Sequence, residues 1–218
     1  MFKNDTFSRT GSYHQISASV YNLILGAVLL WGFALNWWMV ATIPTETIKS
    51  INPLVFIIGY FVSAIVGCII IFSSKNPIIS FFGYNMIVVP IGLVLVMFIP
   101  GHSQENIIAA ARVTTLLTVT MMVLGTLFPA FFKRIEAALF WALCITIVVE
   151  LLQIFVFNVK LGVMDWIVAA IFCGYVGVDW GRANQIERTV DNAVDSAASL
   201  YLDIINLFVR VLEIISKK

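Results

Sequence analysis

Six polar residues cross an otherwise apolar segment near the end of the chain, at steps of three, four, three, four and three. They are Ser196, Ser199, Asp203, Asn206, Arg210 and Glu213. Residues at this spacing share one face of a helix, so the pattern predicts a helix with a polar stripe. Carboxylates and a guanidinium are costly in lipid and must face protein or water. We expect this stripe, called the polar seam below, to face inward and to carry function.

A second aspartate can approach the seam. Asp179 closes one hydrophobic segment, and Asp203 enters the next from the same side because consecutive spans are antiparallel. Two carboxylates in contact share a proton, which makes such a pair sensitive to pH. The pair, with the amide oxygen of Asn206, also suits transient binding of Ca²⁺. Asp203 lies roughly 9 Å into the last hydrophobic segment, so contact requires that the last helix begin early or that the preceding one sit deeper.

Other charged residues have a structural and a functional interpretation. Glu150 is either part of a conduction path or a buried acid hydrogen-bonded to its neighbours. Arg210 and Glu213 are one turn apart and are expected to pair. Asp165 is expected to lie near the outer surface and to be solvated. The whole seam is also consistent with polar contacts that hold membrane helices together.

Composition places the chain in a membrane. Of its 218 residues 61% are hydrophobic and 11% are charged, whereas soluble domains have about 25% charged residues. The net charge of +1 and the lack of a basic run give no reason to expect a nucleic-acid partner. The cysteines fit no metal or redox motif and no cofactor is expected; they are Cys68, Cys144 and Cys173.

Hydropathy predicts an all-α membrane protein with seven transmembrane helices in one bundle over residues 20–215. A polar N-terminal arm (1–19) precedes the bundle, a short tail (216–218) follows it, and no cleavable signal peptide is predicted. The predicted spans are 20–41, 52–72, 78–99, 107–132, 136–157, 161–180 and 197–215.

The connections between spans are marked by turn-forming or charged residues. Asn52-Pro53 and Asn76-Pro77 mark two of them, and Lys133-Arg134 marks another. Residues 181–196 form the only long polar connection, and Pro129 is expected to kink the fourth span. Lys and Arg are more frequent on the side of the N-terminus, so the N-terminus is predicted to be cytoplasmic and the C-terminus outside.

Two segments resemble a known family. Residues 199–208 read SLYLDIINLF, which closely resembles the last-helix signature SLYLDxINLF of the Bax inhibitor-1 (TMBIM, YccA-like) family. Residues 174–180, GYVGVDW, are similar to the end of the family's sixth helix, where Tyr-x-x-x-Asp precedes a polar loop. Lys75-Asn76-Pro77 is similar to the turn between its second and third helices. The span count and short loops extend the resemblance over nearly the full length.

The resemblance implies a bundle with the last helix at its centre and a pH-sensitive Ca²⁺ leak. It assigns the family's proton-sharing pair to Asp179 and Asp203, and Lys75 becomes the candidate for a basic latch on Asp179. The chain departs from the family in having no charge within 52–72 and in having Arg210 where relatives often have a neutral residue. A fixed positive charge there repels Ca²⁺ unless Glu213 neutralises it.

These observations favour a multi-pass membrane protein that is not an enzyme: a pH-sensitive leak channel or transporter for Ca²⁺ or another cation, gated by the Asp179–Asp203 pair. Its partners would be the lipid bilayer, the permeant cation and H⁺. A second hypothesis is a non-transporting regulator that binds a membrane protease or a cell-death partner. A third, an intramembrane aspartyl hydrolase, fits less well because Asp203 follows Leu202 and lacks a Gly-x-Gly-Asp context.

Overall fold

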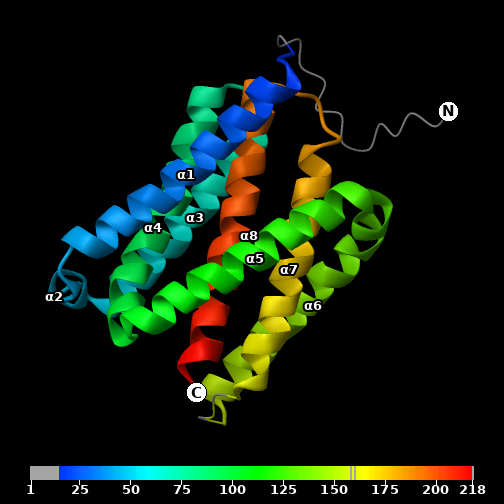
Figure 1. Cartoon of the computed structure of the whole chain (residues 1–218). Helices are drawn as coiled ribbons and strands as arrows, with labels where there is room; N and C mark the ends of the chain where they lie inside the picture. The colour runs from blue at the N-terminus through cyan, green and yellow to red at the C-terminus, as the bar shows by residue number, and fades with distance from the viewer. Residues whose placement is uncertain (1–14, 158, 160, 218) are drawn as a thin grey trace. The chain divides into compact units, whose positions relative to one another are not determined.

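The computed structural model describes residues 15–157, 159 and 161–217, and all secondary structure in them is helical (Figure 1). This confirms the predicted all-α class. Residues 1–14 of the predicted N-terminal arm and residue 218 of the tail lie outside the described residues. The helices are α1 (Ala18–Thr42), α2 (Thr45–Lys49), α3 (Pro53–Ser73), α4 (Pro77–Phe98), η2 (Ile99–Gly101), α5 (Gln104–Leu127), α6 (Pro129–Phe155), α7 (Val163–Ala183) and α8 (Val190–Ser216).

Asparagine–proline pairs start two helices, as the sequence predicts. The side chain of Asn52 accepts hydrogen bonds from the backbone N–H groups of Leu54 and Val55, at 2.9 and 3.4 Å, and caps α3. Asn76 caps α4 in the same way. Proline has no backbone N–H, so the proline that follows each asparagine adds no unpaired donor to the first turn of the helix.

The connection between α5 and α6 is not where the sequence analysis predicts it. Lys133 and Arg134 lie inside α6, and the helices are separated at Phe128, so the prediction of a loop at Lys133-Arg134 is wrong. Pro129 occupies the first turn of α6 and does not kink a continuous span. Its fixed φ and missing N–H suit that position.

The connection before the last helix is also shorter than predicted. Helix α7 continues to Ala183 and α8 begins at Val190, so only residues 184–189 lie between them. The predicted polar connection over 181–196 is therefore wrong for most of its length. Because α8 begins seven residues before 197, Asp203 lies about 20 Å along the helix, at 1.5 Å per residue.

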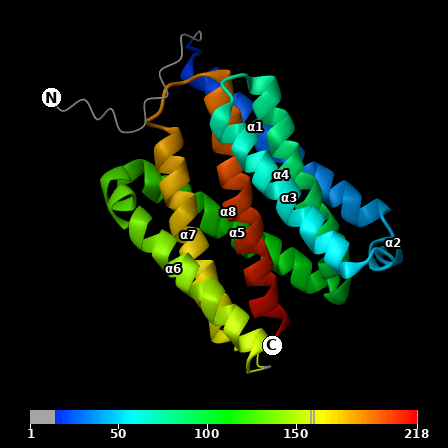
Figure 2. The same cartoon turned by 180° about the vertical axis from the view of Figure 1, so that it is seen from behind.

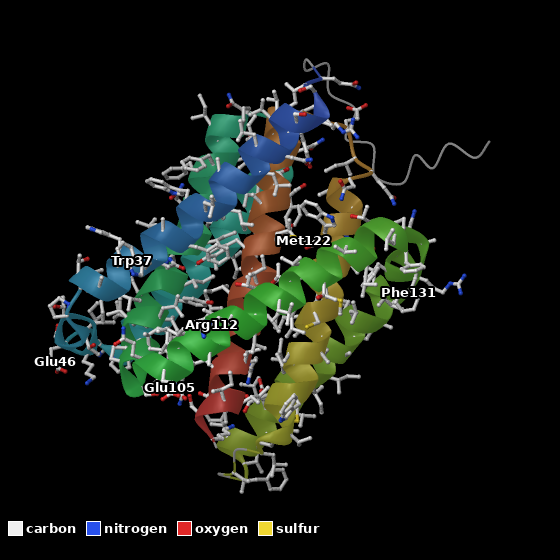
Figure 3. All side chains as sticks on the ribbon, viewed as in Figure 1. Trp37, Glu46, Glu105, Arg112, Met122 and Phe131 are labelled. Carbon is white, nitrogen blue, oxygen red and sulfur yellow. The ribbon has the colours of Figure 1, made fainter. Side chains whose placement is uncertain are left out.

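Six helices in the described part of the chain are long and apolar enough to cross a membrane. Exposed apolar side chains such as Trp37 on α1 and Phe131 on α6 suit a lipid environment (Figure 3). Helix α8 is not among the six, and it carries five charged residues in its 27 positions. The predicted seventh span is thus not confirmed. The six are α1, α3, Pro77–Gly101, α5, α6 and α7.

The described residues divide into two compact units. The first comprises 15–101 and 186–201, and the second comprises 102–157, 159, 161–185 and 202–217. Helix α8 contributes its first part to one unit and its second part to the other.

In the first unit α4 packs against α1, α2 and α3, and α3 and α4 lie side by side in both views (Figure 1, Figure 2). Hydrogen bonds attach the first part of α8 to this group. Ser80 donates to Asp191 at 2.7 Å, and the hydroxyl groups of Tyr21 and Ser196 lie 2.9 Å apart. These polar contacts are buried, where unpaired groups would be unfavourable.

In the second unit α7 packs against both α5 and α6. Helices α5 and α7 approach closely where Gly125 faces Gly177. A Cβ atom added to Gly125 would lie 2.5 Å from the carbonyl oxygen of Gly177, so the approach requires glycine. This close contact fixes the part of α7 that carries Asp179.

Candidate functional site

The two aspartates singled out by the sequence meet in the second unit. Asp179 lies near the end of α7, Asp203 lies in the second part of α8, and their carboxyl groups lie next to each other. Asp203 is only 6% exposed, and its Oδ2 is buried without a hydrogen-bond partner among the described residues. Two neighbouring carboxyl groups can share one proton, and proton sharing by Asp179 and Asp203 stays a prediction.

Arg182, one turn after Asp179, connects this pair to α6. Its Nη1 donates to Oδ1 of Asp179 at 3.0 Å, and its Nη2 donates to Oε1 of Glu136. One guanidinium therefore holds two carboxylates, which is the geometry that the planar arginine fork favours. The sequence analysis did not single out Arg182 or Glu136. The i, i+3 spacing of Asp179 and Arg182 was the available signal.

The remaining polar-seam residues have different surroundings. Ser199 is half-buried in the part of α8 that belongs to the first unit. Asn206, one turn after Asp203, donates from its side-chain amide to the carbonyl oxygen of Leu202 at 2.7 Å. Its donor group is therefore used within its own helix.

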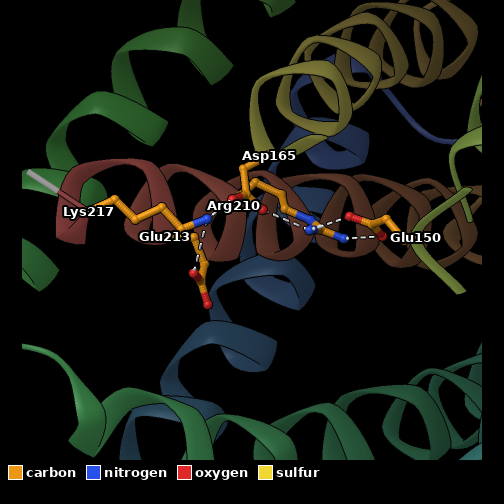
Figure 4. Close-up of polar contacts among 5 residues, drawn as sticks. All are labelled: Glu150, Asp165, Arg210, Glu213 and Lys217. Atoms are coloured by element: carbon orange, nitrogen blue, oxygen red, sulfur yellow. Dashed lines mark hydrogen bonds and ion pairs between the residues drawn. The ribbon is translucent and has the colours of Figure 1, made fainter. Parts of the chain in front are cut away.

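Arg210 lies in a second group of charges, the Arg210 cluster, shown in Figure 4. Its guanidinium contacts both oxygens of Glu150, at 2.7 and 2.8 Å, and Oδ1 of Asp165 at 2.9 Å. Lys217 contacts the other oxygen of Asp165 and lies 3.8 Å from Glu213. The cluster thus joins α6, α7 and the end of α8.

Two sequence expectations are corrected here. Arg210 pairs with Glu150 and Asp165, and Glu213 lies next to Lys217. Asp165 was expected to be solvated, but its side chain is 1% exposed and is held by two cations. Three carboxylates face two cations in the cluster, so Arg210 does not leave an unbalanced positive charge.

Lys75, the latch suggested by the family resemblance, lies in the connection between α3 and α4 and is exposed. It belongs to the first unit, whereas Asp179 belongs to the second. The basic partner that the structure gives Asp179 is Arg182. A latch by Lys75 stays a prediction.

A resident metal centre was not predicted. Within the residues that the structure describes, no three His, Cys, Asp or Glu side chains are grouped so that they could hold a metal ion. Transient contact of a cation with Asp179 and Asp203 stays a prediction.

Six apolar helices and two groups of inward charges define a multi-pass helical integral membrane protein. The model of the family described as "Inhibitor of apoptosis-promoting Bax1" matches residues 14–218. The chain belongs to this Bax inhibitor family, as the last-helix signature suggested.

Curated relatives agree with this assignment. Protein LIFEGUARD 1 of Arabidopsis thaliana is 32% identical over 184 residues, which cover 79% of this chain and 74% of that protein. Protein LIFEGUARD 4 is 32% identical over 66% of this chain and 59% of its own length. Protein LIFEGUARD 3 is 27% identical over 86% of this chain and 85% of its own length.

Proposed function

We propose that this protein is a pH-sensitive leak channel or transporter for a cation, with Ca²⁺ as the favoured ion, gated by the Asp179–Asp203 pair. The observation that supports the proposal is that these two carboxyl groups, on α7 and α8, lie next to each other and that Asp203 is buried. A proton between them holds the two helices together. Its loss leaves two neighbouring negative charges that repel each other.

The same change alters how the site treats cations. With the proton in place, the pair carries one negative charge, which Arg182 faces. Without the proton, the second charge and the unpartnered Oδ2 of Asp203 are available to a hard cation such as Ca²⁺. Loss of the proton thus favours both helix separation and cation entry, and we expect flux to rise with pH.

The proposal includes α8 as a seventh crossing at the centre of the bundle, with the N-terminus in the cytoplasm. Every α8 residue from 191 to 216 is buried or half-buried, which supports an inward position for its charges. The sequence signature of the last helix supports the same topology. A charged helix crosses a bilayer only when its polar groups face protein or water.

The proposal predicts that Asp203→Asn abolishes the pH dependence of flux. The asparagine amide can donate to Asp179 as the protonated carboxyl does, but it does not titrate. In liposomes loaded with a Ca²⁺ dye, wild-type flux should rise between about pH 6 and pH 8. The Asp203→Asn variant should stay at the low flux of the acidic condition throughout this range.

Glu105→Gln is the matched control, because it also neutralises an acid, on the exposed first turn of α5 (Figure 3). Its flux should follow the wild-type pH profile. A wild-type profile in Asp203→Asn, or pH-independent flux in the wild type itself, would contradict gating by the pair. Replacing Ca²⁺ by other cations in the same assay tests the ion.

A second candidate function is a membrane regulator that binds a protein partner without transporting ions. The observation that favours it is the family description, which names inhibition of the apoptosis-promoting protein Bax1. A stoichiometric partner recovered in mild detergent, together with no flux at any pH, would favour this function over the leak.

A further inference from the structure

A pocket of about 390 Å³ opens between α6 and α7 in the second unit, one turn of α7 before Asp179. Five of its lining residues belong to the first half of α6 and the sixth, Tyr175, lies on α7 one turn before Asp179. The pocket thus lies between Glu136 on α6 and α7, the helix that carries Asp179. Its lining residues are Lys133, Glu136, Ala137, Phe140, Trp141 and Tyr175.

An unbroken series of polar contacts leads from this pocket to Asp203. Glu136 lines the pocket and accepts a hydrogen bond from Arg182. Arg182 also donates to Asp179, whose carboxyl group lies next to that of Asp203. The side chains of Glu136 and Arg182 are both 33% exposed, whereas that of Asp179 is 12% exposed. Exposure therefore decreases from the pocket towards the pair.

We propose that this pocket is the aqueous entrance through which protons reach the Asp179–Asp203 pair, and that the Glu136–Arg182 ion pair sets the acidity at which the pair takes up its proton. This inference rests on the proposed function and extends it to the access route. A hydronium ion in the pocket gives its proton to a carboxylate and leaves water behind. No other bond forms or breaks.

Glu136 acts on the Asp179–Asp203 pair through Arg182, which contacts both Glu136 and Asp179. While Glu136 is ionised, it shares the guanidinium with Asp179 and adds a negative charge beside it. Both effects make ionisation of the pair less favourable. Glu136 and Arg182 are thus positioning residues that act through charge.

The other charged and titratable groups around the Asp179–Asp203 pair are consistent with the pocket as its entrance. Among the described residues of the second unit, the titratable or charged side chains near the pair come from α6, α7 and α8. On α5, which also packs against α7, Thr126 contacts Trp180. Arg112, on the same helix, is 14 residues from Thr126, about 21 Å along the axis. The α6, α7 and α8 groups are Lys133, Glu136, Cys144, Tyr175, Asp179, Arg182 and Asp203.

The first test reads the proton on the pair without any ion flux. Infrared difference spectroscopy of the protein in liposomes follows the C=O band of a protonated carboxyl group, assigned by its loss in Asp203→Asn. Glu136→Gln removes the negative charge that shares the Arg182 guanidinium with Asp179. The band should therefore titrate about one pH unit lower than in the wild type. Glu136→Asp keeps the charge and should titrate near the wild-type midpoint.

The second test examines access through the pocket. In a background with its three native cysteines replaced by alanine, Ala137→Cys places a thiol in the pocket, and Ala138→Cys places one on the same helix outside it. A charged methanethiosulfonate reagent should slow exchange of the pair's proton for deuterium by about tenfold in Ala137→Cys. It should leave exchange in Ala138→Cys unchanged.

The two tests separate failure of this inference from failure of the proposed function. An unchanged band midpoint in Glu136→Gln, or equal exchange in the two modified cysteine variants, would overturn the entrance assignment. pH-independent Ca²⁺ flux with a band that moves as expected would reject the proposed gating and retain the entrance. A shifted midpoint, selective slowing at 137 and pH-dependent flux together support both.

Discussion

Arg210→Met is expected to lower the free energy of unfolding by about 3–5 kcal/mol, the usual effect of removing one partner from a buried ion pair. Arg210 contacts Glu150 and Asp165 at 2.7 to 2.9 Å, and the side chain of Asp165 is 1% exposed. Methionine keeps the apolar part of the side chain but leaves Glu150 without its cation. For a chain of this size the loss corresponds to a drop in Tm of roughly 10 °C.

Thermal and urea unfolding in the same detergent measure this effect. Arg112→Met makes the same chemical change at an exposed position on α5 and should alter stability by less than about 0.5 kcal/mol. Arg210→Met combined with Glu150→Leu should recover most of the loss, because a charge pair replaced by apolar residues leaves no unpaired charge. Equal stability of Arg210→Met and Arg112→Met would show that the Arg210 cluster does not hold α6, α7 and α8 together.

The Arg210 cluster also shows what local spacing cannot reveal. Arg210 and Glu213 are one turn apart, and that spacing suggests a pair. The structure gives Arg210 two partners that are 60 and 45 residues away in the chain. Local spacing reports neighbours on one helix, whereas a buried guanidinium is satisfied by whichever carboxylates the packing of other helices brings near it.

Asp179 and Asp203 were predictable as a pair because their helices are consecutive and antiparallel. The obstacle was depth, since Asp203 seemed to lie too far into a helix that begins near 197. In the structure α7 extends to Ala183 and α8 begins at Val190, so Asp203 lies further along its helix than predicted, yet the two aspartates still lie next to each other. Polar residues in 190–196 suggest a loop by composition, but hydrogen bonds such as those of Asp191 and Ser196 let them continue a helix inside the protein.

Helix boundaries, too, are predictable from the sequence where neighbouring residues in the chain determine them. Asn52 and Asn76 mark helix starts through bonds to their own neighbours, so the sequence predicts them. Lys133 and Arg134 suggest a loop by charge, yet Pro129 starts the helix before them. Their position in the first two turns of α6 is one from which long cationic side chains can reach water.

Gly125→Leu is expected to destabilise the protein by about 3 kcal/mol and to disturb gating, because it separates α5 from α7. A Cβ atom at Gly125 would lie 2.5 Å from the carbonyl oxygen of Gly177, and a backbone atom cannot rotate away as a side chain can. Asp179 is two residues after Gly177, so movement of α7 also moves the aspartate pair. The Ca²⁺ flux of this variant should therefore lose its wild-type pH profile.

Gly59→Leu is the matched control for this prediction. Gly59 also lies within a helix, α3, but a Cβ atom there would meet nothing within 4 Å. Leucine has a higher helix propensity than glycine, so this variant should be as stable as the wild type or more stable by up to about 1 kcal/mol. A loss of stability in Gly125→Leu together with a gain in Gly59→Leu would show that the effect at Gly125 comes from close helix packing and not from helix propensity. A Gly125→Leu variant that unfolds like Gly59→Leu would show that α5 and α7 do not depend on this contact.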